Sequence, residues 1–264
     1  SVLILPEARF ERFTVKAGLN SVFQTDEAAE WLPVLGVDWF AGDNSSVHLS
    51  YTETEQQPDY QTLYYSDPYR VGNAFLNQQR SKNAELGFRQ FLSARLDWSV
   101  AGFYRRLENA SDWTQTAAGG VWAATDLGDL NMGGVDAAIT YRPSEDLVVK
   151  AFYQWMKKDS VDVYAGLYEL DYPEHMLNFS VWWKFVNELA AEFAQTTRWQ
   201  AANNARTSDE FGADATVGLH YFPRYAKNVR LSFLVENIWG SDLQVIPGLE
   251  PRPTSFFAAI NVNW

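Results

Sequence analysis

Alternation of apolar and polar residues is the feature that most constrains this chain. Between Asn228 and Trp239, apolar residues fall on one face of an extended chain and polar residues on the other, and the same period of two recurs at 174–185 and 146–157. Successive side chains of a β-strand point to opposite faces, so this period is typical of strands. The sequence therefore predicts strands with one apolar side and one polar side.

Extended to the whole chain, the pattern predicts about twelve strands in a single all-β domain over residues 1–264. The strands are expected at 10–24, 31–41, 46–56, 82–92, 95–108, 132–143, 146–157, 174–185, 187–199, 213–223, 226–239 and 254–264. Tight turns alternate with long polar connections at 57–81, 109–131, 158–173, 200–212 and 240–253. Short turns on one side and long loops on the other are typical of antiparallel barrels of the outer membrane.

Membrane insertion is favoured over a soluble β-sandwich, although no run of about 18 apolar residues could form a transmembrane helix. Mean hydropathy is only -0.28, yet 16% of residues are aromatic, and many of these lie near the predicted strand ends, as in the girdles of membrane barrels. The predicted strands are also longer than the five to six residues usual in soluble proteins. We therefore expect an antiparallel transmembrane β-barrel.

The last eleven residues place an apolar series on one face and end in an aromatic residue. The series comprises Phe256, Ala258, Ile260, Val262 and Trp264. It resembles the assembly signal of bacterial outer-membrane proteins. That resemblance implies a bacterial outer-membrane location, with the barrel assembly machinery, membrane lipid and lipopolysaccharide as partners.

Several internal segments resemble the barrel of TonB-dependent receptors and keep the order of that family. They are Pro33 to Tyr51, Asn83-Ala-Glu-Leu-Gly-Phe-Arg89, Gly134 to Leu147, Pro173 to Asn178, Val235-Glu-Asn-Ile-Trp-Gly-Ser-Asp-Leu243 and Pro247 to Phe257. The resemblance implies an outer-membrane receptor that takes up or recognises a scarce ligand such as a metal chelate, vitamin or glycan. A structural barrel subunit or anchor of an outer-membrane assembly is the alternative, and a passive pore is another.

The family has a 22-stranded barrel closed by a plug domain, whereas the sequence predicts about twelve strands and no plug. Two accounts are open: a complete small barrel with an even strand count and both termini in the periplasm, or the C-terminal half of a larger barrel. The chain's first residues lack the pattern of a signal peptide, so one has been removed or the chain is cut from something longer. Uptake by the family's mechanism would need a plug or partner chain in an outer-membrane complex. We therefore expect no energised transport by this chain alone.

Composition excludes several functions. A net charge of -12 argues against a nucleic-acid partner, and the absence of cysteine excludes thiolate sites. His48 and Ser50 share a face, but no further catalytic motif accompanies them, so two polar lumen residues are the default interpretation. Acidic loop residues lack the spacing of a calcium motif. We expect no enzyme activity, metal site or cofactor.

Two sets of residues are candidates for function. Loop aromatics could hold a flat or sugar-like ligand, with packing as the alternative for each; they are Tyr60, Tyr64, Tyr65, Tyr69, Trp113 and Trp122. The inward face is expected to carry charges of both signs, which could pair across strands, line a water-filled path or hold a plug.

Overall fold

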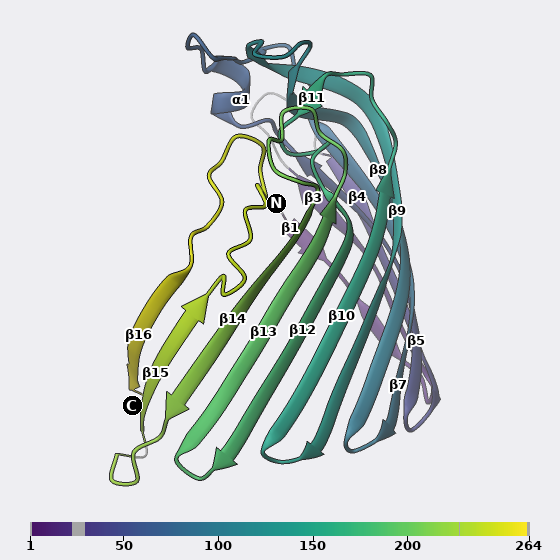
Figure 1. Ribbon diagram of the computed structural model, residues 1–264. Helices are drawn as coiled ribbons and strands as arrows, with labels where there is room; N and C mark the ends of the chain where they lie inside the picture. The colour runs from purple at the N-terminus through teal and green to yellow at the C-terminus, as the bar shows by residue number, and fades with distance from the viewer. Residues whose placement is uncertain (1, 23–29, 227, 263–264) are drawn as a thin grey trace.

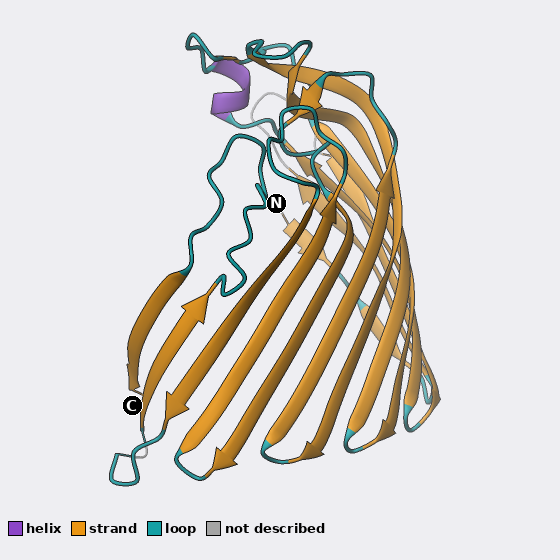
Figure 2. Cartoon of the chain, in the orientation of Figure 1, coloured by secondary structure: helices purple, strands orange, loops and turns teal. Residues whose placement is uncertain are grey.

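The computed structural model describes residues 2–22, 30–226 and 228–262. These residues form sixteen strands and one short helix, and thirteen strands follow one another as antiparallel neighbours in a single curved sheet (Figures 1 and 2). In sheet order, these strands are β1 (Val2–Ile4), β3 (Phe13–Val22), β4 (Glu30–Gly42), β5 (Ser45–Gln56), β7 (Gln79–Ser93), β8 (Leu96–Gln115), β9 (Trp122–Ser144), β10 (Leu147–Lys158), β12 (Pro173–Val186), β13 (Leu189–Gln200), β14 (Phe211–Tyr221), β15 (Val229–Glu236) and β16 (Ser255–Val262).

The twelve strands predicted from alternation are all present, and the all-β fold is confirmed. Their connections separate into two ends of the sheet. The turn end carries tight connections such as 43–44, 94–95 and 187–188, and the loop end carries long ones such as 57–78 and 237–254. Three short strands and helix α1 lie outside the main path; they are β2 (Glu7–Arg9), β6 (Arg70–Val71), β11 (Ala165–Gly166) and α1 (Tyr60–Tyr64).

The edge of the sheet beside β3 differs from the prediction. Residues 2–9 pair with β3 in one register as β1 and β2, interrupted near Pro6, and they run from the loop end to the turn end. The path thus has thirteen strands instead of an even number. Within the described residues, β1 and β16 do not pair with each other, so the sheet is an open wall, which differs from the small closed barrel that was one of the two accounts left open by the sequence.

The segment predicted as loop 109–131 is instead an extended hairpin. Strand β8 continues to Gln115 and β9 begins at Trp122, so the connection is only 116–121. The register shifts around Ala110, with Asn109 at a φ of 54° and Gly128 at a φ of 70°. Such a bulge moves side chains to the other face, so the period of two is lost in the sequence although the strands continue.

The two faces of the wall differ in chemistry, as the alternation predicted. We call the face covered by the connections 159–172 and 237–254 the inner face, and the opposite one the outer face. One outer row crosses six strands and is apolar throughout: Val149, Val181, Phe193, Val217, Val235 and Phe256. The adjacent inner row contains Lys150, Ser180, Ala194 and Thr216. Only the outer face therefore suits lipid.

Aromatic side chains gather at both ends of the outer face. Near the loop end, Trp155, His175, Trp199 and Phe211 are consecutive partners across four strands, and the Trp199 and Phe211 rings lie 5.1 Å apart. Exposed aromatics at the turn end include Phe13, Trp39, Tyr141, Trp183 and Tyr221. Two aromatic belts around an apolar band match the interfaces of a bilayer.

Helices play no part in this band. In the described part of the chain, no helix has the length and apolar character to cross a membrane.

Candidate ligand site beneath the loop cap

The long connections at the loop end pack together around their own apolar core. Leu76, Trp113, Ala124 and Leu167 are buried in one cluster, and they come from the connection 57–78, both arms of the β8–β9 hairpin and the connection 159–172. Ile246 adds the connection 237–254. We call these segments, with 201–210, the loop cap. Burial against one another fixes segments that are far apart in the sequence.

A buried ion pair links two connections of the cap. Arg206 bonds Asp171, and each side chain is only 1% exposed. Asn203 supports the pair by donating to the Gly166 carbonyl at 2.7 Å and to Asp171 at 3.2 Å. Burial raises the pKa of Asp171 above its ordinary value, although Arg206 opposes this shift. A pair this deeply buried holds the connections 159–172 and 201–210 together because separating it would leave an uncompensated charge.

Asp112 holds the connection 159–172 against the hairpin. Its carboxylate accepts backbone N–H groups of Tyr168 and Leu170 at 3.0 to 3.1 Å and of Trp113 at 2.7 Å. Burial raises the pKa of Asp112 to about 6, and the backbone donors limit the rise. The cap therefore contains a carboxylate that titrates near neutral pH.

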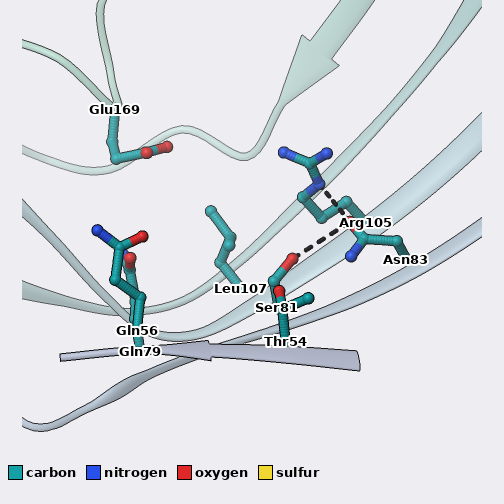
Figure 3. A pocket seen from close by; sticks show the side chains of 8 residues that line it. All are labelled: Thr54, Gln56, Gln79, Ser81, Asn83, Arg105, Leu107 and Glu169. Atoms are coloured by element: carbon teal, nitrogen blue, oxygen red, sulfur yellow. Dashed lines mark hydrogen bonds between the residues drawn. The ribbon is translucent and has the colours of Figure 1, made fainter. Parts of the chain in front are cut away.

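A polar cleft of about 360 Å³ lies on the inner face beneath this cap (Figure 3). Alternate residues of three neighbouring strands line it, and one residue of the cap completes it. The lining residues are Thr54, Gln56, Gln79, Ser81, Asn83, Arg105, Leu107 and Glu169. Seven of the eight side chains are polar, so the cleft suits a ligand rich in hydrogen-bonding groups.

One cation dominates the electrostatics of the cleft. Arg105 donates through Nε to the side-chain oxygen of Asn83, which also accepts from Ser81 at 3.2 Å. Among the described residues, Arg105 has no ion-pair partner. Glu169 is neutralised by Lys158, with Nζ and Oε2 3.0 Å apart. Arg105 thus presents a free positive charge to the cleft, in the direction seen in Figure 3. Guanidinium groups favour oxygen anions such as carboxylates.

The loop aromatics predicted from the sequence fall into two groups, and none of them lines this cleft. Tyr60, Tyr64, Tyr65 and Tyr69 are exposed on the connection 57–78; the first is 78% exposed, and its ring lies 5.1 Å from that of Tyr64. Trp113 is 7% exposed, and Trp122 packs against the same core. The two tryptophans thus pack in the cap and the four tyrosines are exposed, and ligand contact stays a prediction for all six residues.

Several charges elsewhere on the inner face pair across strands. Lys16 meets Asp38 at 3.6 Å, and Asp97 bridges Arg89 and Arg142. His48 bonds the Glu85 carboxylate through Nε2 at 2.7 Å. These contacts favour a structural role for the paired charges.

The residues of the predicted assembly signal lie on the last strand. Phe256, Ile260 and Val262 share the outer face of β16 and are exposed. Trp264 lies outside the described residues.

Alternation in the sequence does not reveal the cleft residues. Gln79, Ser81 and Asn83 come just before the Glu-Leu-Gly-Phe-Arg motif, and Thr54 and Gln56 lie in the preceding strand, but the residues between them, such as Arg80 and Glu55, are polar too. Pairing these two sets requires knowledge of the register, which places Thr54 opposite Ser81 and Gln56 opposite Gln79.

Comparison with known proteins places the fold. Residues 2–238 match the family model of the TonB-dependent receptor-like β-barrel. The siderophore receptor PirA from Pseudomonas aeruginosa is 15% identical with a TM-score of 0.71, and the match covers 98% of this chain and 45% of the PirA chain. The FrpB iron transporter from Neisseria meningitidis is 15% identical with a TM-score of 0.69, covering 98% and 44%. The copper transporter OprC is 15% identical with a TM-score of 0.67, covering 96% and 45%.

This chain therefore spans less than half the length of each of these structures. No curated protein matches it. The family match covers most of the chain, and it agrees with the antiparallel wall, the apolar outer band and the aromatic belts described above. The chain belongs to the β-barrel family of TonB-dependent receptors, which lie in the bacterial outer membrane.

Proposed function

We propose that this chain forms the wall of an outer-membrane receptor that recognises and admits an anionic metal chelate through the cleft at Arg105. The observation that carries the proposal is the free charge of Arg105 among amide and hydroxyl groups beneath a packed cap. Metal chelates present oxygen anions on a compact surface, and such groups pair well with a guanidinium. A vitamin or a glycan offers less negative charge and fits this cleft less well.

Whole-cell binding tests the proposal with two matched probes. Cells that carry the protein are given the iron(III) complex of a tris-catecholate chelator, which is anionic, or of a tris-hydroxamate chelator, which is neutral. We expect the anionic complex to bind more tightly. Arg105→Gln should weaken its binding about tenfold, because a charge-assisted hydrogen bond contributes roughly 1.5 to 3 kcal/mol.

The neighbouring arginine supplies the control. Arg106 points to the outer face, where it pairs with Asp129 at 2.6 Å. Arg106→Gln should therefore leave binding unchanged. Equal losses for the two variants, or no preference for the anionic probe, would reject the cleft as the binding site.

Conductance separates the receptor from the two other functions. In a planar bilayer, steady open-channel current from the purified protein would identify a passive pore. A silent protein that binds neither chelate would favour a structural subunit of an outer-membrane assembly.

We also propose that the apolar outer face of β16 acts as an assembly signal that ends in Trp264. Phe256, Ile260 and Val262 support this by lying together on the lipid-facing side. Trp264→Phe should retain outer-membrane yield, whereas Trp264→Asp should reduce it, because an aromatic ring with or without a polar N–H favours the interface. Equal yields for the two variants would reject the signal.

A further inference from the structure

A second cavity lies on the inner face, between strands β13 and β14 and the connection 237–254. It measures about 390 Å³ and shares no lining residue with the cleft at Arg105. We call the connection 237–254 the strap. In Figure 1 the strap is the yellow chain that rises from β15 and returns to β16.

The base of the strap is fixed by Asn237. Its side-chain amide donates to the carbonyls of Ser241 at 3.1 Å and Arg252 at 2.7 Å, while its Oδ1 accepts the Ser241 N–H at 2.8 Å. Thr254 donates to the backbone carbonyl of Asn237 at 2.8 Å. Asn237 has a φ of 48°, which asparagine tolerates better than most residues. One side chain thus closes both ends of the strap.

The middle of the strap is fixed against the wall and the cap. Gln200 donates to the Val245 carbonyl at 3.3 Å, and Gln244 exchanges hydrogen bonds with Thr207 and Ser208 at 3.0 Å. Leu243 lies so close to Gly212 that a Cβ at this position would overlap its side chain. The cavity is therefore preformed, which reduces the entropic cost of binding a ligand.

Charged residues of both signs surround the cavity without meeting one another. Arg198 and Asp214 come from the wall, and Glu250 and Arg252 come from the strap. In the described part of the chain, none of the four side chains forms an ion pair or a side-chain hydrogen bond, and the Oδ1 atom of Asp214 is buried without a partner. Elsewhere on the inner face, charges such as those of Lys16 and Asp38 do pair, at 3.6 Å. Unpaired charges of both signs around one cavity need an explanation, because burying an unpartnered carboxylate oxygen is costly.

The register places an arginine and an aspartate side by side in the wall of the cavity. Arg198 lies opposite Gly212 and Thr196 lies opposite Asp214, so Arg198 and Asp214 are diagonal neighbours on adjacent strands. Such neighbours are about 7 to 8 Å apart at their Cα atoms. Both side chains line the cavity, so a ligand with an ammonium and a carboxylate on one carbon atom can meet the two groups together.

We propose that this cavity binds a small zwitterion of the α-amino acid class. The ligand carboxylate lies between Arg198 and Arg252, and its ammonium group lies between Asp214 and Glu250. Leu243, Val245 and Leu249 give the ligand side chain an apolar surface. The inference does not rest on the proposed recognition of a metal chelate, since the two cavities are separate.

Leucine and two analogues test the proposal on the whole protein in outer-membrane vesicles. Leucinamide lacks the carboxylate, and 4-methylpentanoate lacks the ammonium group, but all three share one apolar side chain. Equilibrium dialysis of radiolabelled probes should show that leucine binds at least tenfold more tightly than either analogue. Equal affinities for the three probes, or no leucine binding at millimolar concentration, would overturn the proposal.

Two variants and a control assign the charges. Arg198→Gln should weaken leucine binding at least fivefold and leave leucinamide binding unchanged. Asp214→Asn should weaken leucine binding and leave 4-methylpentanoate binding unchanged. Arg230→Gln removes a cation that does not line the cavity, and it should have no effect. Heat-modifiable migration in gels checks that each variant is folded. If a folded Arg198→Gln protein lost the binding of all three probes, the assigned role of that arginine would be contradicted.

Discussion

The membrane wall and the loop cap place their apolar side chains in opposite ways. The wall turns its apolar residues outward, with Phe233 51% exposed, and its strands are held by backbone hydrogen bonds to their neighbours. The cap buries Trp113 and Leu167 within itself, as a soluble protein does. The wall therefore depends on lipid to cover its side chains, whereas the cap depends on contacts between its own segments. Mutations in the wall should consequently reduce folded yield in the membrane, whereas mutations in the cap should reduce its resistance to protease.

The largest effect is expected at the buried ion pair of the cap. Arg206→Ala leaves Asp171 buried without its cation, which costs roughly 3 to 5 kcal/mol. Added protease should then cleave the connection 159–172 in intact cells, while heat-modifiable migration shows an unchanged wall. The double variant Arg206→Met with Asp171→Leu removes both charges and should recover most of the resistance. A cap that resists protease equally well in the single variant would show that the pair does not hold it.

The wall should respond to charge on one face only. Val181→Arg places a cation against lipid and costs roughly 2 to 4 kcal/mol near mid-membrane. Ser180→Arg places the same side chain on the inner face and should fold nearly normally. Folded yield in the outer membrane measures both variants. Similar losses at the two positions would mean that the faces are assigned wrongly.

A pH effect is expected in the cap because the folded pKa of Asp112 is raised to about 6 by burial. The folded cap then binds more protons than the unfolded cap between about pH 4 and pH 6, so its stability should fall as the pH rises through this window. Asp171 contributes in the same direction. Hydrogen exchange of the Tyr168 and Leu170 amides should report a change of about 3 kcal/mol at most.

Asp112→Asn is the matched variant for this titration. It keeps one acceptor oxygen for the backbone donors and removes the ionisable group. The pH dependence of exchange should be clearly flatter in the variant than in the parent. An identical slope would assign the titration to another group.

The smallest effect is expected at the exposed tyrosines of the cap. Tyr60→Ala should change the free energy of unfolding of the cap, as measured by protease resistance, by no more than about 0.5 kcal/mol, because the side chain is largely in solvent. Trp113→Ala in the same cap should cost several times more through lost packing. A large loss of stability in Tyr60→Ala would place this residue in the core of the cap.

The same contrast decides what could be predicted from sequence. In the wall, one periodicity indicates both the strand and its apolar side, so the segments at 174–185 and 226–239 were predicted as strands and are β12 and β15. The cap has no period, because its segments meet through long-range contacts such as the packing of Ile246 against the cluster that contains Trp113. The bulge at Ala110 also hid the outer part of the β8–β9 hairpin. Cleft residues such as Arg105 need the register of three strands, which alternation alone does not supply.

The direction of the two edge strands has a geometric consequence. Both β1 and β16 run from the loop end to the turn end, so a direct seam between them would be parallel. The same holds for two copies of this wall that share one orientation in the membrane, since rotation about the membrane normal does not reverse a strand. Strictly antiparallel barrels have an even number of strands. Any such cylinder that contains these thirteen strands must therefore insert an odd number of others between the two edges.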